Sequence, residues 1–459
     1  MSRGYIGIDL GTSSVKVLCR YEDDRVEKAK AEYDEISPEG WYHATLKALS
    51  QVDTSEASAI GLSSQVGTYI VNGREVLGWN SPAGASEVKD IKKCYESQAF
   101  IREISMPHPD IASYPIPRLT YIQKMWGAGA EVCQPKDLLG KMLTGRYATD
   151  KYSWRGLANL EKDTYSGYFL KSVGRPKLPE LMEYTANLGT VSEEVSRMTG
   201  IPQGLPVYIG LNDFFASLIG MGVSNVGDMF DITGTSEHLG IITSNIDADT
   251  SMVSGPYIEN FVHYGVTASS GASLDFGMKQ FGYEGLSTAK LPMKDAPVFT
   301  PYLNGERAPV FDSNATGMFF GINGGCTKEH LAYAVLEGVV FGIYHIYENL
   351  GFPAAEKLIV SGGAAKNPVL NALKAEMFGI PVTILEESDT SALGAAMIAA
   401  VGAGAYPDIK AAAVDYCKVK QFINPTGIWK PLLSKRFEIY RELYPQLKLT
   451  CKRLKEVQL

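Results

Sequence analysis

The chain contains one short pattern twice, and no other feature restricts its fold as strongly. The sequence reads "YIGIDLGTSSVKVL" at residues 5–18 and "MFDITGTSEHLGII" at residues 229–242, each a largely apolar run, Gly-Thr-Ser and a second run. Apolar runs of strand length around a short turn predict a β-hairpin. A glycine lets the turn approach a ligand closely, and hydroxyls and turn amides can donate to phosphate oxygens. Two such hairpins facing each other would hold a polyphosphate from both sides, although either one alone is also compatible with a purely structural turn.

Charged residues stand beside the first repeat and at the end of a later strand. Asp9 ends the first strand, where a carboxylate can hold a hydrated Mg²⁺ against phosphates, and Lys16 adds a cation nearby. Asp213 follows the apolar run "LPVYIGLN" and precedes the helix-like run "FFASLIGMG". A carboxylate at that junction can accept a proton from a substrate hydroxyl, but an aspartate there is also a common helix N-cap. The residues alone leave both roles of Asp213 open.

Composition limits the class of protein. A chain of 459 residues exceeds the size of a single core, so we expect two or three domains. The net charge of −8 argues against a general nucleic-acid binder. The six cysteines include no CxxC pair, which favours free thiols in a reducing compartment over zinc or disulfides. The N-terminus lacks a signal-peptide core, and the apolar stretch 391–406 is too short to span a membrane, so we expect a cytoplasmic protein with a buried helix there.

A further loop suits a nucleotide, although the commonest nucleotide motifs are missing. The sequence has no GxxxxGK[ST] loop and no GxGxxG after a strand. In "VSGGAAKN", however, Gly362 and Gly363 follow an apolar strand, and a helix is expected near Pro368. A backbone without side chains lets a flat base lie close to it, and Asn367 can hydrogen-bond adenine. A plain strand-to-helix turn is the alternative.

Nearly the whole chain resembles the FGGY carbohydrate kinases, and within them the xylulokinase-like branch. The segments that carry the resemblance occur in the family's order and are 6–16, 59–65, 77–80, 143–153, 204–222, 231–239, 301–322, 356–382 and 391–406. The resemblance implies an α/β fold of two domains, the actin/hexokinase-like (ribonuclease H-like) fold, with mixed sheets flanked by helices around a central cleft. We expect one domain over residues 1–224 and the other over residues 225–459. We also expect a final amphipathic helix over residues 435–457 that packs back across the body.

The resemblance also implies a role for each candidate residue. Asp213 would be the catalytic base and, with Asp9, a ligand of the Mg²⁺ that accompanies ATP. The remaining assignments are phosphate binding for Gly11, Thr12, Ser13, Lys16, Gly234 and Thr235, nucleotide binding for Gly362, Gly363 and Asn367, and substrate binding for Gln65, Trp79, Tyr114 and Asp213. The loop "GERAP" (305–309) contains a Glu306–Arg307 pair that is expected to be buried and to organise the cleft between the domains.

The sugar pocket departs from the xylulokinase pattern. Gly67, Ser81, Ala83 and Phe214 stand where that pattern has hydrogen-bonding side chains. A pocket without those groups cannot form hydrogen bonds to the same substrate hydroxyls. The substrate is therefore expected to be a ketopentose or a related sugar or polyol that is smaller, deoxygenated or differently oriented. Further residues that could fill the space are Tyr69, Tyr114 and Arg118, and Trp79 could be a core aromatic instead of a sugar contact.

Three functions remain open from the sequence. The first is an ATP-dependent kinase of a small sugar or polyol. The second is a nucleotide-binding sensor on the same fold that has lost sugar turnover; the missing pocket groups favour it, whereas Asp9, Asp213 and the two Gly-Thr-Ser turns argue against it. The third is a filament- or chaperone-like ATPase, against which the "GERAP" and "GGAAKN" segments argue. The resemblance is also compatible with a homodimer, and it implies neither nucleic acid nor membrane as a partner.

Overall fold

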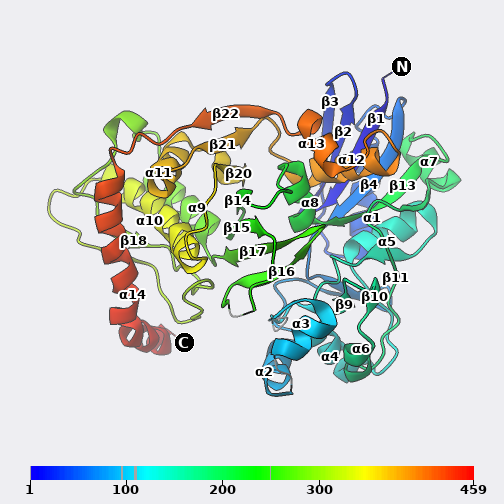
Figure 1. Cartoon of the computed structure of the whole chain (residues 1–459), viewed down its shortest axis with the longest axis horizontal. Helices are drawn as coiled ribbons and strands as arrows, with labels where there is room; N and C mark the ends of the chain where they lie inside the picture. Colours follow the sequence, from blue (N-terminus) through cyan, green and yellow to red (C-terminus); the bar gives the residue numbers. More distant parts are fainter. Residues whose placement is uncertain (1, 95–96, 108–110, 249, 459) are drawn as a thin grey trace.

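The first lobe is built on a six-stranded mixed sheet (Figure 1). The computed structural model describes residues 2–94, 97–107, 111–248 and 250–458, and the side chain of Cys94 lies outside the described part. In sheet order the strands are β12 (Asn187–Thr190), β13 (Pro206–Asn212), β4 (Ala57–Ser64), β1 (Gly4–Leu10), β2 (Ser14–Tyr21) and β3 (Val26–Glu32). β1, β2 and β3 form an antiparallel meander, while β4 lies parallel to both β1 and β13. Every residue of β1 is buried, as expected for a continuous apolar run.

The second lobe repeats this arrangement in a seven-stranded sheet. In sheet order its strands are β16 (Val253–Tyr257), β17 (Asn260–Val266), β15 (Glu237–Thr243), β14 (Met229–Thr233), β20 (Leu358–Gly362), β21 (Val382–Leu385) and β22 (Val419–Ile423). β14 has an antiparallel partner in β15 and a parallel partner in β20, just as β1 has in β2 and β4. The sequence repeat therefore marks the same strand–turn–strand unit in both lobes, and both predicted hairpins are confirmed.

Helices and short strands surround the two sheets. The helices before residue 225 are α1 (Pro38–Leu49), α2 (Ala85–Cys94), α3 (Ser97–Ile104), α4 (Pro115–Trp126), α5 (Pro135–Thr144), α6 (Gly167–Ser172), α7 (Glu193–Thr199) and α8 (Asp213–Gly220). The later ones are α9 (Ser270–Phe281), η1 (Thr288–Lys290), α10 (Lys328–Asn349), η2 (Gly363–Lys366), α11 (Pro368–Phe378), α12 (Thr390–Gly402), α13 (Ile409–Tyr416) and α14 (Lys430–Gln458). The short strands are β5 (Tyr69–Val71), β6 (Glu75–Leu77), β7 (Val132–Cys133), β8 (Ala148–Asp150), β9 (Ala158–Asn159), β10 (Thr164–Tyr165), β11 (Glu180–Met182), β18 (Val298–Thr300) and β19 (Met318–Phe320).

Helix α12 crosses from the second half of the chain onto the first sheet. The helix predicted over 391–406 is present but ends at Gly402; residues 390–400 are all buried, whereas Ala403 and Gly404 lie beyond its end and are exposed. It packs against β1, β4 and α8 at backbone distance. A Cβ atom on Gly61 would lie 1.9 Å from the carbonyl oxygen of Ala395, and one on Gly394 would lie 1.9 Å from that of Ala216. Helix and sheet can approach this closely only because glycines face each other's backbone.

We expect Gly7→Ala to destabilise the protein by about 3 kcal/mol, because the added methyl group cannot be accommodated. Its Cβ would lie 1.8 Å from the carbonyl oxygen of Ala392 in α12, and backbone cannot rotate away as a side chain can. Gly167→Ala is the matched control, because Gly167 faces open space and its change should stay within about 0.5 kcal/mol. Denaturant unfolding of both variants measures the two free energies of unfolding. Equal values for Gly7→Ala and Gly167→Ala would show that α12 can move away from β1 to make room for the methyl group.

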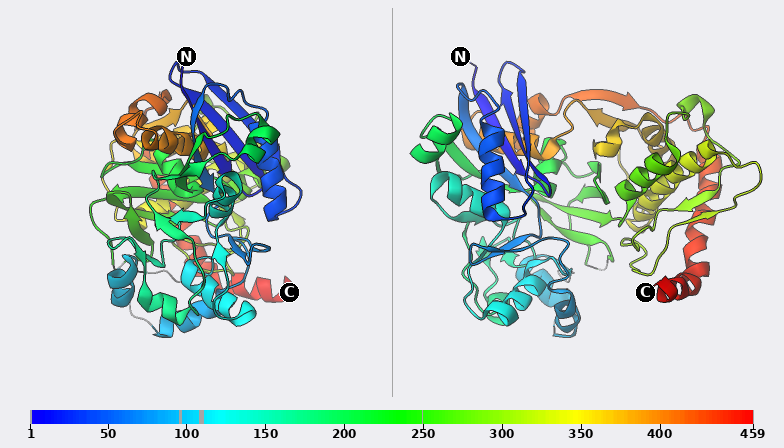
Figure 2. Two further views of the ribbon diagram at one scale, coloured as in Figure 1. Left: turned by 90° about the vertical axis from the view of Figure 1, so that its right-hand side faces the viewer. Right: turned by 180° about the vertical axis from the view of Figure 1, so that it is seen from behind.

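The C-terminal helix covers the second lobe only. The expected helix over 435–457 is present as α14, which contacts α10, α11 and β18. Its buried side chains include Leu433, Phe437 and Tyr440. Figure 2 shows α14 along the outer edge of the second lobe, far from the first sheet. No helix in the described part of the chain is both long and apolar enough to cross a membrane.

Candidate active site

Two carboxylates meet where parallel strands of the first sheet end. Asp9 lies next to the last residue of β1, and Asp213 directly follows β13. Asp9 is 5% exposed; its Oδ1 accepts a hydrogen bond from Ser63 Oγ at 3.1 Å, and its Oδ2 accepts one from Ser391. Burial raises the pKa of Asp9 despite these bonds and the charge of Lys16. The carboxyl ends of parallel strands are a common position for ligand sites, because the strands bring their end residues to one edge.

Asp213 is not the N-cap of α8. That position belongs to Asn212, whose Oδ1 accepts a hydrogen bond from the Phe215 amide at 3.1 Å. Asp213 is the first residue of the helix, and its Oδ1 accepts from the amides of Phe214 at 2.8 Å and Val66 at 3.2 Å. Burial and the nearby charge of Asp9 raise the pKa of Asp213 to about 7. A carboxyl group with that pKa can exchange a proton near neutral pH, as a general base must.

The first Gly-Thr-Ser turn presents its hydroxyls to solvent. The Gly11 amide donates to the Ser14 carbonyl at 3.0 Å, and Thr12 and Ser13 are exposed. Lys16 lies on β2, and its ammonium forms a 2.6 Å ion pair with Asp389, just before α12. The turn is therefore open to a ligand, while Lys16 already has a carboxylate partner.

The second Gly-Thr-Ser turn is held against the start of α9. The Gly234 amide donates to the Ser236 carbonyl at 2.8 Å, and the Ala272 amide donates to the Thr235 carbonyl at 3.1 Å. Gly271 allows this contact, because a Cβ there would lie 1.8 Å from the Gly234 carbonyl oxygen.

A cavity of about 590 Å³ joins this turn to the predicted adenosine loop. Gly234, Thr235, Gly363 and Asn367 all line it, so four predicted nucleotide and phosphate residues meet here. Its other walls come mainly from α9 and from the start of α11. The role predicted for Asn367 stays a prediction, and the side chain has a structural task as well, because its Oδ1 accepts from the amides of Val369 and Leu370 and caps α11. Only its amide nitrogen is left for an adenine.

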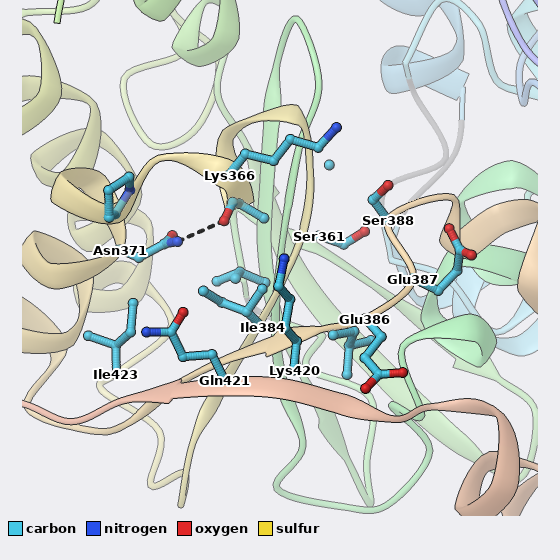
Figure 3. A pocket seen from close by; sticks show the side chains of 15 residues that line it. Ser361, Lys366, Asn371, Ile384, Glu386, Glu387, Ser388, Lys420, Gln421 and Ile423 are labelled. Atoms are coloured by element: carbon cyan, nitrogen blue, oxygen red, sulfur yellow. Dashed lines mark hydrogen bonds between the residues drawn. The ribbon is translucent and has the colours of Figure 1, made fainter. Parts of the chain in front are cut away.

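Gly362 faces a second cavity, on the other side of η2. This cavity, of about 220 Å³, is shown in Figure 3. Gly362 is needed there for the backbone: its φ is +90°, and a Cβ would lie 2.1 Å from the Thr233 carbonyl oxygen. Lys366 lines both cavities, and Asn371 Nδ2 donates to the Ala365 carbonyl at 2.8 Å (Figure 3). Gly362 therefore allows β14 and β20 to pair closely at their ends. It is not among the residues that line the larger cavity.

Of the predicted sugar residues, Gln65 lies beside Asp213, because the amide of the next residue, Val66, donates to the Asp213 carboxylate. Gln65 is 5% exposed and follows β4, where its amide donates to the Leu10 carbonyl at 2.9 Å. Trp79 is 38% exposed, so it is not a core aromatic. Tyr114 stands at the N-cap position of α4. Tyr69 and Arg118, predicted to fill the pocket, are buried beneath it: Tyr69 meets Trp154 edge-on, and Arg118 donates to the Gly78 carbonyl at 3.3 Å.

Three further residues of this region were given no role by the sequence, although His238 lies within the second repeat. Arg155, His238 and Tyr264 surround Phe214, with ring centroids of His238 and Tyr264 at 5.4 Å and 4.7 Å from that of Phe214. Burial and then the charges of Arg307 and Arg155 lower the pKa of His238 to about 4, so its imidazole is neutral at pH 7. Only folding brings these three together, because they lie on separate segments far apart in the sequence.

The expected Glu306–Arg307 pair is not a side-chain pair. Glu306 is buried, and its Oε1 accepts from the backbone amides of Ala268 and of Arg307 itself. The Arg307 residue is exposed. Burial raises the pKa of Glu306 to about 7. The Glu306 carboxylate thus holds the loop 305–309 through backbone amides and does not pair with the Arg307 guanidinium.

A buried ionic network lies under the second phosphate turn and was also missed. Lys374 of α11 pairs with Asp231 of β14 and with Glu237 of β15, the latter at 2.8 Å. Thr233 Oγ1 donates to the same Glu237 oxygen at 2.7 Å. Burial and the charge of Glu237 raise the pKa of Asp231 to about 8. Burial also acts to raise the pKa of Glu237, but the charge and hydrogen bond of Lys374 outweigh it and lower that pKa. The network ties the second Gly-Thr-Ser turn to α11, the helix that begins at Pro368.

Comparison with known proteins identifies the family. Residues 4–220 match the N-terminal domain of the FGGY family of carbohydrate kinases, and residues 230–403 match its C-terminal domain. The chain belongs to the FGGY family of carbohydrate kinases. It is 27% identical to a xylulose kinase of Lactococcus lactis over 96% of both chains. The FGGY kinase described here is therefore an ATP-dependent carbohydrate kinase of the xylulokinase-like branch.

Solved structures share the fold of this FGGY kinase. A ligand-bound xylulose kinase from Lactobacillus acidophilus superposes with a TM-score of 0.85 at 22% identity, over 98% of this chain and 100% of that one. A gluconate kinase from Lactobacillus acidophilus also gives a TM-score of 0.85 at 22% identity, over 97% of this chain and 98% of that one. The expected two-domain actin/hexokinase-like fold is thus confirmed.

Proposed function

We propose that this FGGY kinase transfers the γ-phosphoryl group of MgATP to a hydroxyl of a small sugar or polyol, with Asp213 as the general base. The observation that carries the proposal is Asp213 itself, a carboxyl group with a raised pKa beside Asp9 and the first phosphate turn. Asp213 takes the proton of the acceptor hydroxyl, the oxygen forms a bond to the γ-phosphorus, and ADP leaves with the electrons of the broken bond. Phosphate contacts come from Gly11, Thr12 and Ser13 on one lobe and from Gly234 and Thr235 on the other.

The two carboxylates suit Mg²⁺ as it accompanies ATP. Among the described residues no group of three or more His, Cys, Asp or Glu side chains forms a cage for a metal ion. Mg²⁺ in kinases is instead held by one or two carboxylates together with phosphate oxygens and waters. Asp9 and Asp213 fit that donor set, since they lie close enough for one charge to raise the pKa of the other. Bound there, Mg²⁺ would neutralise charge that builds up on the phosphates.

Release of ADP tests the proposed function. The protein is incubated with MgATP and ketopentoses, polyols, aldonates and deoxy-sugars, beside Asp213→Ala. Xylulose and gluconate come first, because similar proteins are named for them. Acceptor-dependent ADP release that Asp213→Ala abolishes supports the kinase. Nucleotide binding without turnover of any acceptor would favour the sensor, and ADP release without an acceptor would favour a plain ATPase.

We expect Lys16→Met to raise the KM for ATP at least about tenfold, because we place its ammonium beside the bound phosphates. Stability should change by less than about 1 kcal/mol, because the Lys16–Asp389 pair is partly exposed and such pairs contribute little. Steady-state kinetics and denaturant unfolding measure the two quantities. Lys28→Met is the control, because Lys28 pairs with the same loop through Glu387 but stands on β3. An unchanged KM for ATP would mean that Lys16 does not contact the phosphates and serves only in its ion pair with Asp389.

A further inference from the structure

Arg155 is a buried cation beside the proposed acceptor site. It is 6% exposed, and its Nη2 donates to the hydroxyl of Tyr264. Aromatic rings surround the guanidinium, whose central carbon lies 4.8 Å from the centroid of Phe215, 5.6 Å from that of Phe214 and 5.8 Å from that of Tyr114. Its buried Nη1 makes no hydrogen bond of normal geometry within the described part of the chain. Tyr114 also forms a hydrogen bond with the guanidinium, so two tyrosine side chains hold the cation while Nη1 keeps unused donor capacity within the described residues.

No described carboxylate lies within ion-pair distance of Arg155, which is unusual for a buried arginine. Of the other buried arginines, Arg20 pairs with Asp24 and Arg436 pairs with Glu337, whereas Arg118, like Arg155, has no carboxylate at ion-pair distance among the described residues. Removing a guanidinium from water without a counter-ion costs several kcal/mol, and aromatic faces offset only part of that cost. A missing anion is the simplest physical reason to retain such a group next to a binding site.

Arg155 is adjacent to the chemistry and is not an isolated core residue. It touches the rings of Phe214 and Phe215, which directly follow Asp213 at the start of α8. Arg118, on the Trp79 side of the same region, is fully buried, and its Nε and Nη1 also lack partners within the described residues. The lowered pKa of His238, caused by burial and by Arg307 and Arg155, shows that the positive field reaches this part of the cleft. Positive charge therefore accumulates where polar groups of the sugar pocket are missing.

We infer that the acceptor of this kinase is a sugar acid whose carboxylate binds Arg155, while one of its hydroxyls faces Asp213. The inference rests on the proposed function, since it names the class of that acceptor. A guanidinium recognises a carboxylate through charge-assisted hydrogen bonds. A carboxylate carries the single negative charge that one buried guanidinium balances, whereas a phosphate monoester would add close to two. Arg155 would thus decide specificity for acids over neutral sugars of the same length.

The test compares acids with neutral partners on the unmodified protein. kcat/KM is measured for five- and six-carbon aldonates, for the alditols and aldoses of the same carbon number, and for the corresponding sugar phosphates. We expect an aldonate to exceed its neutral partners at least about 30-fold, the factor that a buried charge pair supports. A neutral sugar or a sugar phosphate as the better acceptor would overturn the inference and leave the proposed kinase intact.

Variants then assign the preference to Arg155. Arg155→Met keeps the volume and should lower kcat/KM for the aldonate at least about 30-fold more than it lowers kcat/KM for neutral acceptors. Arg155→Lys should restore part of the loss, and ADP binding by calorimetry checks that each variant is folded. If no acceptor of any class is phosphorylated, the proposed function fails. In that event, aldonate binding that Arg155→Met abolishes would still support the anion site, and absence of binding would overturn it.

Discussion

Asp213→Asn is expected to lower the turnover number with the preferred acceptor by about a thousandfold, while the affinity for ADP changes little. Asparagine has the same shape, and its Oδ1 can still accept from the Phe214 and Val66 amides, so the start of α8 should be preserved. What is lost is the basic oxygen that takes the acceptor proton. Steady-state turnover and calorimetric ADP binding measure the two effects. A loss of less than tenfold would mean that proton transfer to Asp213 is not needed.

The same variant is expected to remove a pH dependence. The pKa of Asp213 is raised to about 7 without a metal ion, and Mg²⁺ bound beside it would lower that pKa, so kcat/KM of the unmodified protein should rise with pH and level off by about pH 7, and Asp213→Asn should lack that inflection. The stability of the folded protein depends on pH in the opposite sense to kcat/KM. The folded state holds this proton more tightly than the unfolded chain, so stability is lost as pH rises from about 4 to about 7. Without Mg²⁺ and nucleotide, the stability gain of Asp213→Asn should therefore be larger at pH 8 than at pH 5, by about 2 kcal/mol.

Lys374→Met is expected to lower the free energy of unfolding by about 4 kcal/mol, because it leaves Glu237 and Asp231 buried without a cation. Lys374 is 1% exposed, and both carboxylates are fully buried, so water cannot replace the ammonium. The KM for ATP should rise as well, because Asp231 and Glu237 flank the turn that carries Gly234 and Thr235. Denaturant unfolding and ATP kinetics measure the two effects.

Two companion variants separate charge from general damage to the second lobe. Lys290→Met removes an ammonium from an exposed pair with Glu329 at 3.4 Å, and its stability should change by less than about 0.5 kcal/mol. In Lys374→Met/Glu237→Gln only Asp231 remains, and that carboxyl can stay protonated, so part of the lost stability should return. A double variant as unstable as the sum of its parts would contradict an ionic origin.

Local pattern was sufficient wherever the neighbours in sequence are also the neighbours in space. The hairpins around Gly11 and Gly234, the helix that begins at Pro368 and the buried helix α12 all follow from runs of apolar residues and the turns between them. Asp213 could be placed at a strand-to-helix junction for the same reason, although only the structure shows that Asn212 is the cap. The family could be predicted because its motifs are contiguous segments in a fixed order.

Contacts between segments that lie far apart in the sequence could not be predicted from local pattern. Glu306 and Arg307 are adjacent in sequence and suggested a side-chain pair, but Glu306 accepts from the Ala268 amide on another segment. Lys374 lies more than 130 residues from both of its partners, at separations of 143 and 137. Arg155 donates to Tyr264 across 109 residues. Neither hydrophobic periodicity nor the spacing of residues in the sequence indicates such pairs.

The sequence by itself therefore determined the strand–turn–strand repeat, the order of the two lobes and the family to which the chain belongs. Each of these depends on continuous apolar runs or on a turn of a few residues, which are local properties of the chain. Only the tertiary structure decided which charges are buried together, which glycines let α12 reach β1, and which side chains stand around Phe214. Those outcomes depend on desolvation and on close contact between elements, and both arise only once the two sheets and their helices have packed.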